Sequence, residues 1–581
     1  MAVSIPGRSD ADPVATLLLR SGIAALLLCA LAAFTIPRSV PGTLIEYYFF
    51  HQDFWLLGAG GLMLCVLSRF DVGDRPLALG PWHLAGATLL IAVLAYAGSF
   101  VVMEHYALSR DEAIAEFAAE TFQRGEMARA VPRGLNSLAE AMMPWTGGWA
   151  ANGIWMPGYL PGNSLLRAGA GLLGDRFLAG PILLVIGCAA LWTSARKIWP
   201  DRRDAATVAV VLALTSTQVV ATAMTPFAMT AHFALNALWL VFYLRRDLMG
   251  HVVAIAIGLL ASGLHQIQFH ILFVSGFIVW DLASGRRRTA LLYAGACFGY
   301  LVFWDQVYSR YLLALAFGPL PFVAGPEIPF YLQIRRAADR IGDLQPISNL
   351  ARFAAWQNIL LLPLAFVGAR GLQDDEGKPT IAVAFAVSCM IGLLLMLYQG
   401  LGYGYRYLHG VIPCFCLLAA GGWVRLSTQR GRSIPAVLLW AACGFAIVFT
   451  APLALTLSHR FLHPYATAYR LLRGADADVV LIDGRGGAFI EDLARLDGPI
   501  AQPILLDMSY VSLADLHRLC TTGSVMVFDQ VQARPLGIMF GGDAGKYERH
   551  LTNGRALMRR WHCGRPVPLP LPAPVPLPPQ T

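Results

Sequence analysis

The sequence has few charged residues, and this scarcity excludes an ordinary soluble protein. Only 14% of its 581 residues are charged, whereas 56% are hydrophobic. An average soluble chain is roughly 25% charged. The apolar residues gather into stretches of about 20, the length that crosses a hydrocarbon core of about 30 Å as a helix. The chain is therefore predicted to be a polytopic α-helical membrane protein.

The sequence also lacks the motifs of several function classes. It has no CxxC pair and no His/Cys spacing typical of a metal site, so neither a metal nor a cofactor is expected. The turn Gly484–Gly487 does not have the spacing of a dinucleotide fingerprint. The net charge of +8 comes from arginines at the ends of apolar segments, without basic patches that contain interleaved aromatics. Nucleic acid is therefore not expected as a partner, whereas membrane lipids are.

Most of the ten cysteines lie inside apolar segments, where a free cysteine behaves as a small core residue. The two exceptions are Cys520 and Cys563, in the polar C-terminal part. They are predicted to form a disulfide if this part faces an oxidising compartment.

Hydropathy predicts about 11–13 membrane helices. The first has no small-residue cleavage site and is predicted to be a retained helix, not a signal peptide. The thirteen segments are roughly 14–35, 53–69, 82–103, 177–195, 204–223, 229–244, 250–264, 268–283, 288–304, 347–369, 379–398, 407–424 and 434–456.

Arginines in the short loops predict the orientation of the chain. They occur on alternate connections, around Arg196, Arg245, Arg286 and Arg425. The intervening short loops have none, except for Arg406 after the eleventh helix. Because basic loops stay in the cytoplasm, the N-terminus is predicted to be cytoplasmic. The Ala- and Arg-rich composition favours a bacterial inner membrane, although a protein of the endoplasmic reticulum would have the same orientation.

This orientation divides the chain into a membrane part, an outer domain and a tail. The membrane part is predicted over 1–456, with two long outward-facing loops at about 104–176 and 305–346. Residues 457–564 are predicted to form a small extracytoplasmic α/β domain. Its expected elements are strands at 478–483, 503–506 and 524–528 and a helix over 489–496. The eight prolines of 565–581 predict a disordered tail.

The first outer loop contains an amphipathic helix that Gly125 is expected to end. Apolar positions such as Ile114 and Phe117 recur at helical spacing, and Glu116 and Glu120 fall on another face. We expect this helix to lie at the membrane surface.

Asp111 and Glu112 begin this helix, and two interpretations of the pair are open. Ser109 followed by Glu112 is a capping box, and acidic residues in a first turn are favoured by the helix dipole. Alternatively, one of the two carboxylates accepts a proton in a reaction.

The order of motifs in this loop resembles a known family. A membrane helix is followed by Arg110-Asp111-Glu112, an amphipathic helix, Gln123-Arg124-Gly125, a Val131-Pro132 break and Tyr159-Leu160-Pro161-Gly162. Gly404-Tyr405-Arg406-Tyr407 follows late in the chain. This pattern resembles the GT-C membrane glycosyltransferases, and most closely the branch of protein O-mannosyltransferases and lipid A aminoarabinose transferases. The chain departs from that branch at Tyr159-Leu160, where many members have an acidic residue and a lysine.

The resemblance implies a glycosyltransferase that moves a sugar from a polyprenyl-phosphate carrier to an acceptor at the outer membrane face. The acceptor would be a glycolipid, a polysaccharide or a protein. Asp111 would be the general base, with Glu112 as the fallback, and a single displacement would invert the anomeric carbon. For the departing phosphate, Arg406 is the first candidate, and an interfacial snorkelling arginine is the alternative.

Other polar and aromatic residues are candidates for substrate binding. His265 and His270 flank an outer hairpin between two membrane helices, where polar residues are costly unless they face a polar cavity. Alternatively, the two histidines lie in an exposed loop, which tolerates polar side chains without any role in binding. Tyr159, with Trp145, Trp149 and Trp155, could stack on sugar rings or the prenyl chain, although an interfacial aromatic belt is the commoner arrangement.

Two other function classes remain as alternatives to an enzyme. A lipid-linked sugar flippase or other transporter would have intramembrane charges and broken helices. A non-catalytic scaffold would bind partners through the C-terminal domain. The intact acidic pair and the large first loop favour the enzyme.

Overall fold

The computed structural model describes residues 12–39, 44–70, 77, 79–144, 153–317, 345–371, 380–395, 403–430, 434–540 and 548–569. The chain divides into two compact units, each of which is described by itself. The first comprises Met1–Gly98, Phe177–Tyr308 and Phe322–Leu457. The second comprises Ser99–Arg176, Ser309–Pro321 and Ser458–Thr581. The second unit therefore combines the first outer loop with the C-terminal region.

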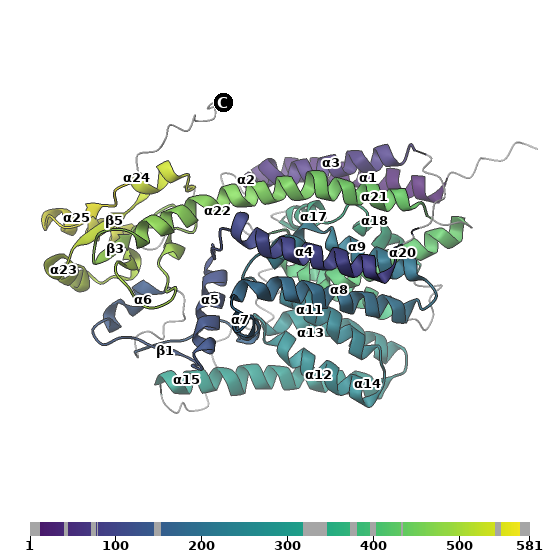
Figure 1. The fold of residues 1–581 in the computed structure, drawn as a ribbon, viewed down its shortest axis with the longest axis horizontal. Coiled ribbons are helices and arrows are strands. Elements are labelled where there is room, and N and C mark those ends of the chain that lie inside the picture. The colour runs from purple at the N-terminus through teal and green to yellow at the C-terminus, as the bar shows by residue number, and fades with distance from the viewer. Residues whose placement is uncertain are drawn as a thin grey trace, which may run out of the picture. The chain divides into compact units, whose positions relative to one another are not determined.

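The first unit is a bundle of helices (Figure 1). Pairs that pack together include α1 with α3, α8 with α11, and α18 with α20. Its α-helices are α1 (Pro13–Ser39), α2 (Leu44–Tyr48), α3 (Phe54–Leu67), α4 (Pro81–Val101), α8 (Ala179–Ile198), α9 (Arg203–Leu214), α10 (Thr217–Ala223), α11 (Met229–Tyr243), α12 (Leu248–Ser262), α13 (Ile267–Ala283), α14 (Arg287–Leu301), α17 (Gln345–Ala355), α18 (Leu361–Arg370), α19 (Thr380–Ile391), α20 (Ile412–Arg430) and α21 (Ala436–Phe445).

Within the described residues, seven helices are long and apolar enough to cross a membrane. They are Pro13–Arg38, Leu44–Leu67, Pro81–Val101, Arg176–Ile198, Arg287–Leu312, Arg406–Gln429 and Ala436–Arg473. The pair α9 and α10, bent by 59°, makes up to one more span, and five further apolar helices are shorter. Each of the thirteen predicted segments overlaps one of these helices. The prediction of a polytopic helical membrane protein is confirmed.

Two predicted spans are broken where we expected continuous helices. The fifth breaks between α9 and α10, where Ser216 Oγ accepts a hydrogen bond from the backbone N–H of Val219 and caps the second helix. The tenth breaks between α17 and α18, where Asn358 Oδ1 accepts a hydrogen bond from Leu360 N–H. Polar side chains that bond to the nearby backbone compete with helix continuation, which hydropathy does not register.

The predicted start of the second outer loop, residue 305, is wrong. The helix continues from α14 through a π-helical segment, Val302–Tyr308, into α15 (Ser309–Phe317). The polar side chains of Asp305 and Gln306 hydrogen-bond to each other, so they do not interrupt the helical backbone. The rest of this loop, 318–344, lies outside the described residues, as do Arg335, Arg336 and Arg340.

The second unit has one core, to which the first outer loop and the C-terminal region both contribute. Ile114 and Phe117 of the loop and Val479, Leu506 and other sheet residues are buried in the same cluster. The loop helix was expected to lie at the membrane surface, and its apolar face packs against protein. The α-helices of this unit are α5 (Arg110–Gln123), α6 (Ala139–Met142), α7 (Gly162–Gly171), α15, the end of α22 (Ala451–Arg473), α23 (Leu513–Thr522), α24 (Gln530–Ala533) and α25 (Glu548–Arg560).

A parallel sheet forms the C-terminal α/β domain, as predicted. Its strands are β3 (Val479–Ile482), β4 (Ile504–Asp507), β5 (Val525–Phe528) and β6 (Arg565–Pro566), in the order β4-β3-β5-β6. Helices α23 and α25 lie beside the strands (Figure 1). A two-stranded ribbon of β1 (Arg129–Ala130) and β2 (Ile154–Trp155) belongs to the first loop. Cys520 and Cys563 form a disulfide in this domain.

Two details of the predicted domain are wrong. The helix expected over 489–496 is only a 3-10 turn, Glu491–Leu493, because Phe489 takes a left-handed φ of 56° before it and Ala494 is extended after it. Residues 565–569 were expected to belong to a disordered tail but are ordered, and 570–581 lie outside the described residues. Strand β6 pairs with β5, and Val567 donates a backbone hydrogen bond to Val527 and is 3% exposed. An unpaired strand edge favours this addition despite the prolines.

Candidate functional site

The start of α5 is fixed by the predicted capping box. Glu112 Oε2 accepts hydrogen bonds of 3.0 Å from both the backbone N–H and Oγ of Ser109. The Glu112 side chain is buried, and Gly125, with φ of +74°, follows the helix end as predicted. The carboxylate of Glu112 is thus occupied in stabilising the helix end.

Asp111 has a different environment, although it is the next residue along the chain. It is half-buried, and its Oδ1 accepts a hydrogen bond of 2.5 Å from the hydroxyl of Tyr159. Tyr159 lies between β2 and α7 and is also half-buried. A distance near 2.5 Å is typical of an O–H group bonded to a carboxylate. The structure thus brings together two residues that the sequence singled out for separate reasons.

The C-terminal domain holds the first residue of α5 in place. Asp492 Oδ2 accepts a hydrogen bond of 3.1 Å from Arg110 N–H, and the Arg110 guanidinium forms an ion pair with Glu491. Burial raises the pKa of Asp492 to about 7, although the nearby Arg110 acts in the opposite direction. Asp507, at the end of β4, is also buried, and its pKa is likewise raised to about 7.

Glu116 anchors the opposite face of α5. Its Oε2 accepts a hydrogen bond of 2.8 Å from Arg176, and its Oε1 forms an ion pair with the buried Arg167 of α7. Burial opposes the charge on Glu116, but the two arginines outweigh it and hold the pKa of Glu116 below its usual range. The acidic face of the amphipathic helix is therefore neutralised inside the protein, which rigidifies the element that carries Asp111.

Arg406 belongs to the first unit and begins the 3-10 helix η9 (Arg406–Val411). Its guanidinium carbon lies 4.4 Å from the centre of the Phe227 ring. Just before it, the carbonyl of Gly404 accepts a hydrogen bond of 3.3 Å from the buried Arg352. Arg352 in turn forms an ion pair of 3.1 Å with the buried Asp53. The backbone that presents Arg406 is thus tied to a buried ion pair.

Of the two predicted histidines, His270 is fully buried and His265 is half-buried. Asn236 connects His270 to η9, because its Oδ1 lies 2.8 Å from His270 Nδ1 and its Nδ2 donates to the Gly410 carbonyl. His270 is therefore linked through Asn236 to the backbone of η9.

The sequence analysis missed the polar residues around η9. Asp53 and Arg352 fall inside predicted spans, and a charge inside an apolar segment is the signal that could have indicated them. Gln218, which donates a hydrogen bond of 3.0 Å to the Tyr405 carbonyl, and His409 gave no comparable signal. Their pairing depends on helix packing.

The aromatic residues divide into two groups. The predictions that Trp155 belongs to an interfacial belt or stacks on a substrate are both wrong. Its side chain is fully buried and donates a hydrogen bond to the Ala139 carbonyl. Trp145 and Trp149 lie outside the described residues. Of the four aromatic candidates, Tyr159 is the one whose described contact involves a candidate catalytic residue.

A cavity of about 960 Å³ lies in the first unit between α1, α3, α18 and α20. Three arginines line it, Arg20, Arg370 and Arg425. They belong to segment ends that the loop charges predict to be cytoplasmic, so the cavity does not fit a donor phosphate at the outer face. No metal site was expected from the sequence, but one group of described residues, Glu104, His459 and His463, lies close enough together to hold a metal ion.

No family model and no curated protein matches this chain. Solved structures that are similar to it include ArnT from Cupriavidus metallidurans bound to undecaprenyl phosphate, at 13% identity over 83% of this chain and 90% of that one, with a TM-score of 0.48. They also include ArnT from the same organism in the apo state, at 15% identity over 67% of this chain and 70% of that one, with a TM-score of 0.40. Both are lipid A aminoarabinose transferases, from the branch that the first-loop motifs resemble. Both TM-scores lie below 0.5, so the function proposed below rests on the residues of this chain.

Proposed function

We propose that this chain is an inverting glycosyltransferase that moves a sugar from a polyprenyl-phosphate carrier to an acceptor at the extracytoplasmic membrane face. The observation that carries the proposal is the pair of carboxylates at the start of α5. Glu112 is buried in the capping box, whereas the half-buried Asp111 is oriented by the Tyr159 hydroxyl. One carboxylate therefore serves the fold and the adjacent one serves the reaction.

In the proposed step, Asp111 accepts the proton of an acceptor hydroxyl. The acceptor oxygen forms a bond to the anomeric carbon while the bond from that carbon to the phosphate oxygen breaks. The electron pair of the broken bond leaves with the polyprenyl phosphate. One displacement inverts the anomeric configuration, and the products are the glycosylated acceptor, the carrier phosphate and a protonated Asp111.

The departing phosphate gains negative charge, which a cation can stabilise. We propose Arg406 for this role, with His265 as a second contact. The hydrogen bonds around η9 hold the backbone at Arg406, and its guanidinium lies over the Phe227 ring. Arg406→Ala is expected to weaken binding of polyprenyl phosphate, whereas Arg406→Lys retains the charge and is expected to recover part of it.

The proposed orientation places the N-terminus in the cytoplasm and the C-terminal domain in the periplasm of a bacterial inner membrane. The alternating loop arginines support it. The disulfide between Cys520 and Cys563 is also compatible with an oxidising compartment. Single cysteines introduced into the C-terminal domain can be labelled in intact cells, and their reaction with a membrane-impermeant reagent tests this orientation.

The first experiment measures transfer from a panel of radiolabelled polyprenyl-phosphate sugars to membrane extract. Asp111→Asn is expected to lower the rate by at least about 100-fold while the protein remains folded. Glu140→Gln, a change at an exposed acidic residue of the same unit, is the matched control. Activity that survives in Asp111→Asn but is lost in a folded Glu112→Gln would transfer the base role to Glu112.

A lipid-linked sugar flippase is the second candidate, and two observations favour it. The span formed by α9 and α10 is broken, and the Asp53–Arg352 ion pair is buried within the first unit. Transporters often have such features at their binding sites. Translocation of a labelled donor across proteoliposomes without transfer to any acceptor would favour the flippase.

A further inference from the structure

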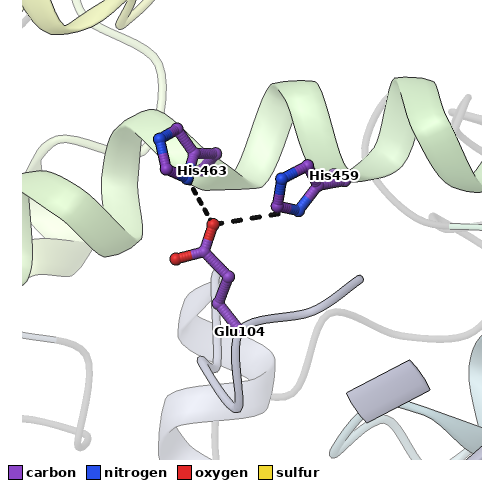
Figure 2. A group of neighbouring side chains, drawn as sticks. All are labelled: Glu104, His459 and His463. Carbon is purple, nitrogen blue, oxygen red and sulfur yellow. Dashed lines mark hydrogen bonds and ion pairs between the residues drawn. The ribbon is translucent and has the colours of Figure 1, made fainter. Parts of the chain in front are cut away.

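A carboxylate and two imidazoles converge in the second unit, away from the Asp111–Tyr159 pair. Glu104 lies in the turn after α4, and His459 and His463 are one helical turn apart on α22. Figure 2 shows both rings on the same side of the helix, facing one oxygen of Glu104. Two histidines four residues apart on a helix are a recurrent metal-binding arrangement.

The distances between these side chains suit a single ion. The three possible ligand atoms lie within 4.8 Å of one another. Glu104 Oε1 is 2.5 Å from Nδ1 of His463 and 3.8 Å from Nδ1 of His459. Ligands of a tetrahedral zinc ion, with bonds of 2.0–2.2 Å, lie about 3.4 Å apart. The two distances lie on either side of that value, so small side-chain rotations would complete the site.

The second oxygen of Glu104 has a different partner. Its Oε2 accepts a hydrogen bond of 2.7 Å from Arg470, also on α22. Carboxylates that bind metals are commonly hydrogen-bonded in this way by an outer group.

The backbone supports the same conclusion. Glu104 and His105 have φ values of 49° and 51°, a left-handed conformation that is uncommon for residues other than glycine. Such conformations concentrate at functional sites. The Val102 carbonyl also lies 3.0 Å from His459 Nδ1, so without an ion it accepts a hydrogen bond from this nitrogen, which would release that proton on binding a metal.

We infer that Glu104, His459 and His463 form a binding site for a divalent transition-metal ion, with zinc as the best fit. Two imidazoles and one carboxylate suit zinc, whereas magnesium and calcium prefer oxygen ligands throughout. The histidine side chains are 39% and 54% exposed, which leaves a route for the ion and a coordination position for water. A bound ion would link helix α22 to the turn that precedes α5 and hold the two together. The site is independent of the proposed transfer reaction.

The test uses full-length protein in detergent, stripped with a chelator and titrated with zinc against a fluorescent indicator. Wild type is expected to bind one equivalent that magnesium does not displace. Glu104→Gln, His459→Gln and His463→Gln are each expected to weaken binding by more than about 100-fold, beyond the usual effect of an outer-shell change. His517→Ala removes an exposed histidine elsewhere in the same unit and is expected to leave binding unchanged.

Circular dichroism and size-exclusion chromatography check that the variants fold. Zinc X-ray absorption on wild type needs no variant and is expected to show two imidazole nitrogens, with oxygen ligands at about 2.0–2.2 Å. Zinc binding that is equal in wild type and the three single variants, or a metal shell without histidine, would overturn the inference. In that case the cluster is an ion pair of Glu104 with Arg470, to which His463 adds a hydrogen bond.

Discussion

The hydrogen bond between Tyr159 and Asp111 leads to a prediction that separates a catalytic carboxylate from a capping one. Tyr159→Phe removes the hydroxyl that donates a hydrogen bond of 2.5 Å to Asp111 Oδ1, while the aromatic ring remains. The carboxylate is then no longer held in a single orientation. If Asp111 is the base, the chemical step slows while the protein remains folded.

The magnitude follows from the type of bond. A hydrogen bond to a charged group contributes about 1.5–3 kcal/mol. At about 1.4 kcal/mol per tenfold change, losing that contribution in the transition state lowers kcat by roughly 10- to 150-fold. Asp111→Asn removes the base itself and is expected to cost at least about 100-fold. In the Asp111→Asn background the Tyr159 change has no base left to orient, so the double variant should match the single Asp111 variant.

The assay is a double-mutant cycle on transfer from a polyprenyl-phosphate sugar donor, with kcat and KM measured separately. Tyr311→Phe, at an exposed tyrosine of the same unit, is the control and is expected to leave kcat unchanged. Independent, multiplicative losses in the double variant would refute the coupling. A Tyr159→Phe effect confined to KM would instead indicate that Tyr159 binds the sugar or the prenyl chain directly.

Further predictions concern the second unit and are checked by thermal and denaturant unfolding. Glu116→Ala leaves two arginine partners without their counter-charge and is expected to cost about 3–5 kcal/mol, whereas the exposed Glu140→Ala costs little. Because the pKa of Glu116 is lowered in the folded state, its contribution to the free energy of unfolding is also expected to disappear as pH falls below about 4. A contribution that persists in acid would contradict this assignment. For Asp492 and Asp507 the pH dependence of stability has the opposite sign. Because their pKa values are about 7 in the folded state, the free energy of unfolding should fall as pH rises from about 4 to 7. Asp492→Asn should make this fall smaller. Cys520→Ser opens a disulfide loop with a sequence separation of 43 and is expected to cost about 4 kcal/mol, an estimate that fails if reducing agent destabilises wild type and variant equally.

Local features of the chain were predictable because short-range physics decides them. The capping box of Ser109 and Glu112 and the glycine end of α5 depend on neighbouring residues alone, and both are confirmed. The strands β3, β4 and β5 were likewise visible as short apolar runs. Breaks such as the one at Ser216 were not, because a single side-chain hydrogen bond to the backbone has no effect on mean hydropathy.

Pairings between distant residues could not be predicted. Nothing in the sequence relates Glu104 to His459 and His463, Asp53 to Arg352, or Asp492 to the start of α5. The apolar face of α5 shows the same limit. Its periodicity predicts burial, but a membrane surface and a protein core satisfy that periodicity equally well.

The sequence by itself determined that this is a helical membrane protein with a small α/β domain and an acidic pair at the start of a loop helix. The length of a hydrophobic segment and a local helix cap depend on contiguous residues only, so both can be recognised without knowing which distant segments pack against them. Only the tertiary structure decided that Tyr159 orients Asp111 and that the loop helix shares a core with the C-terminal sheet. The reason is that the free energy of these contacts depends on which distant segments pack together, and composition and periodicity leave that choice open.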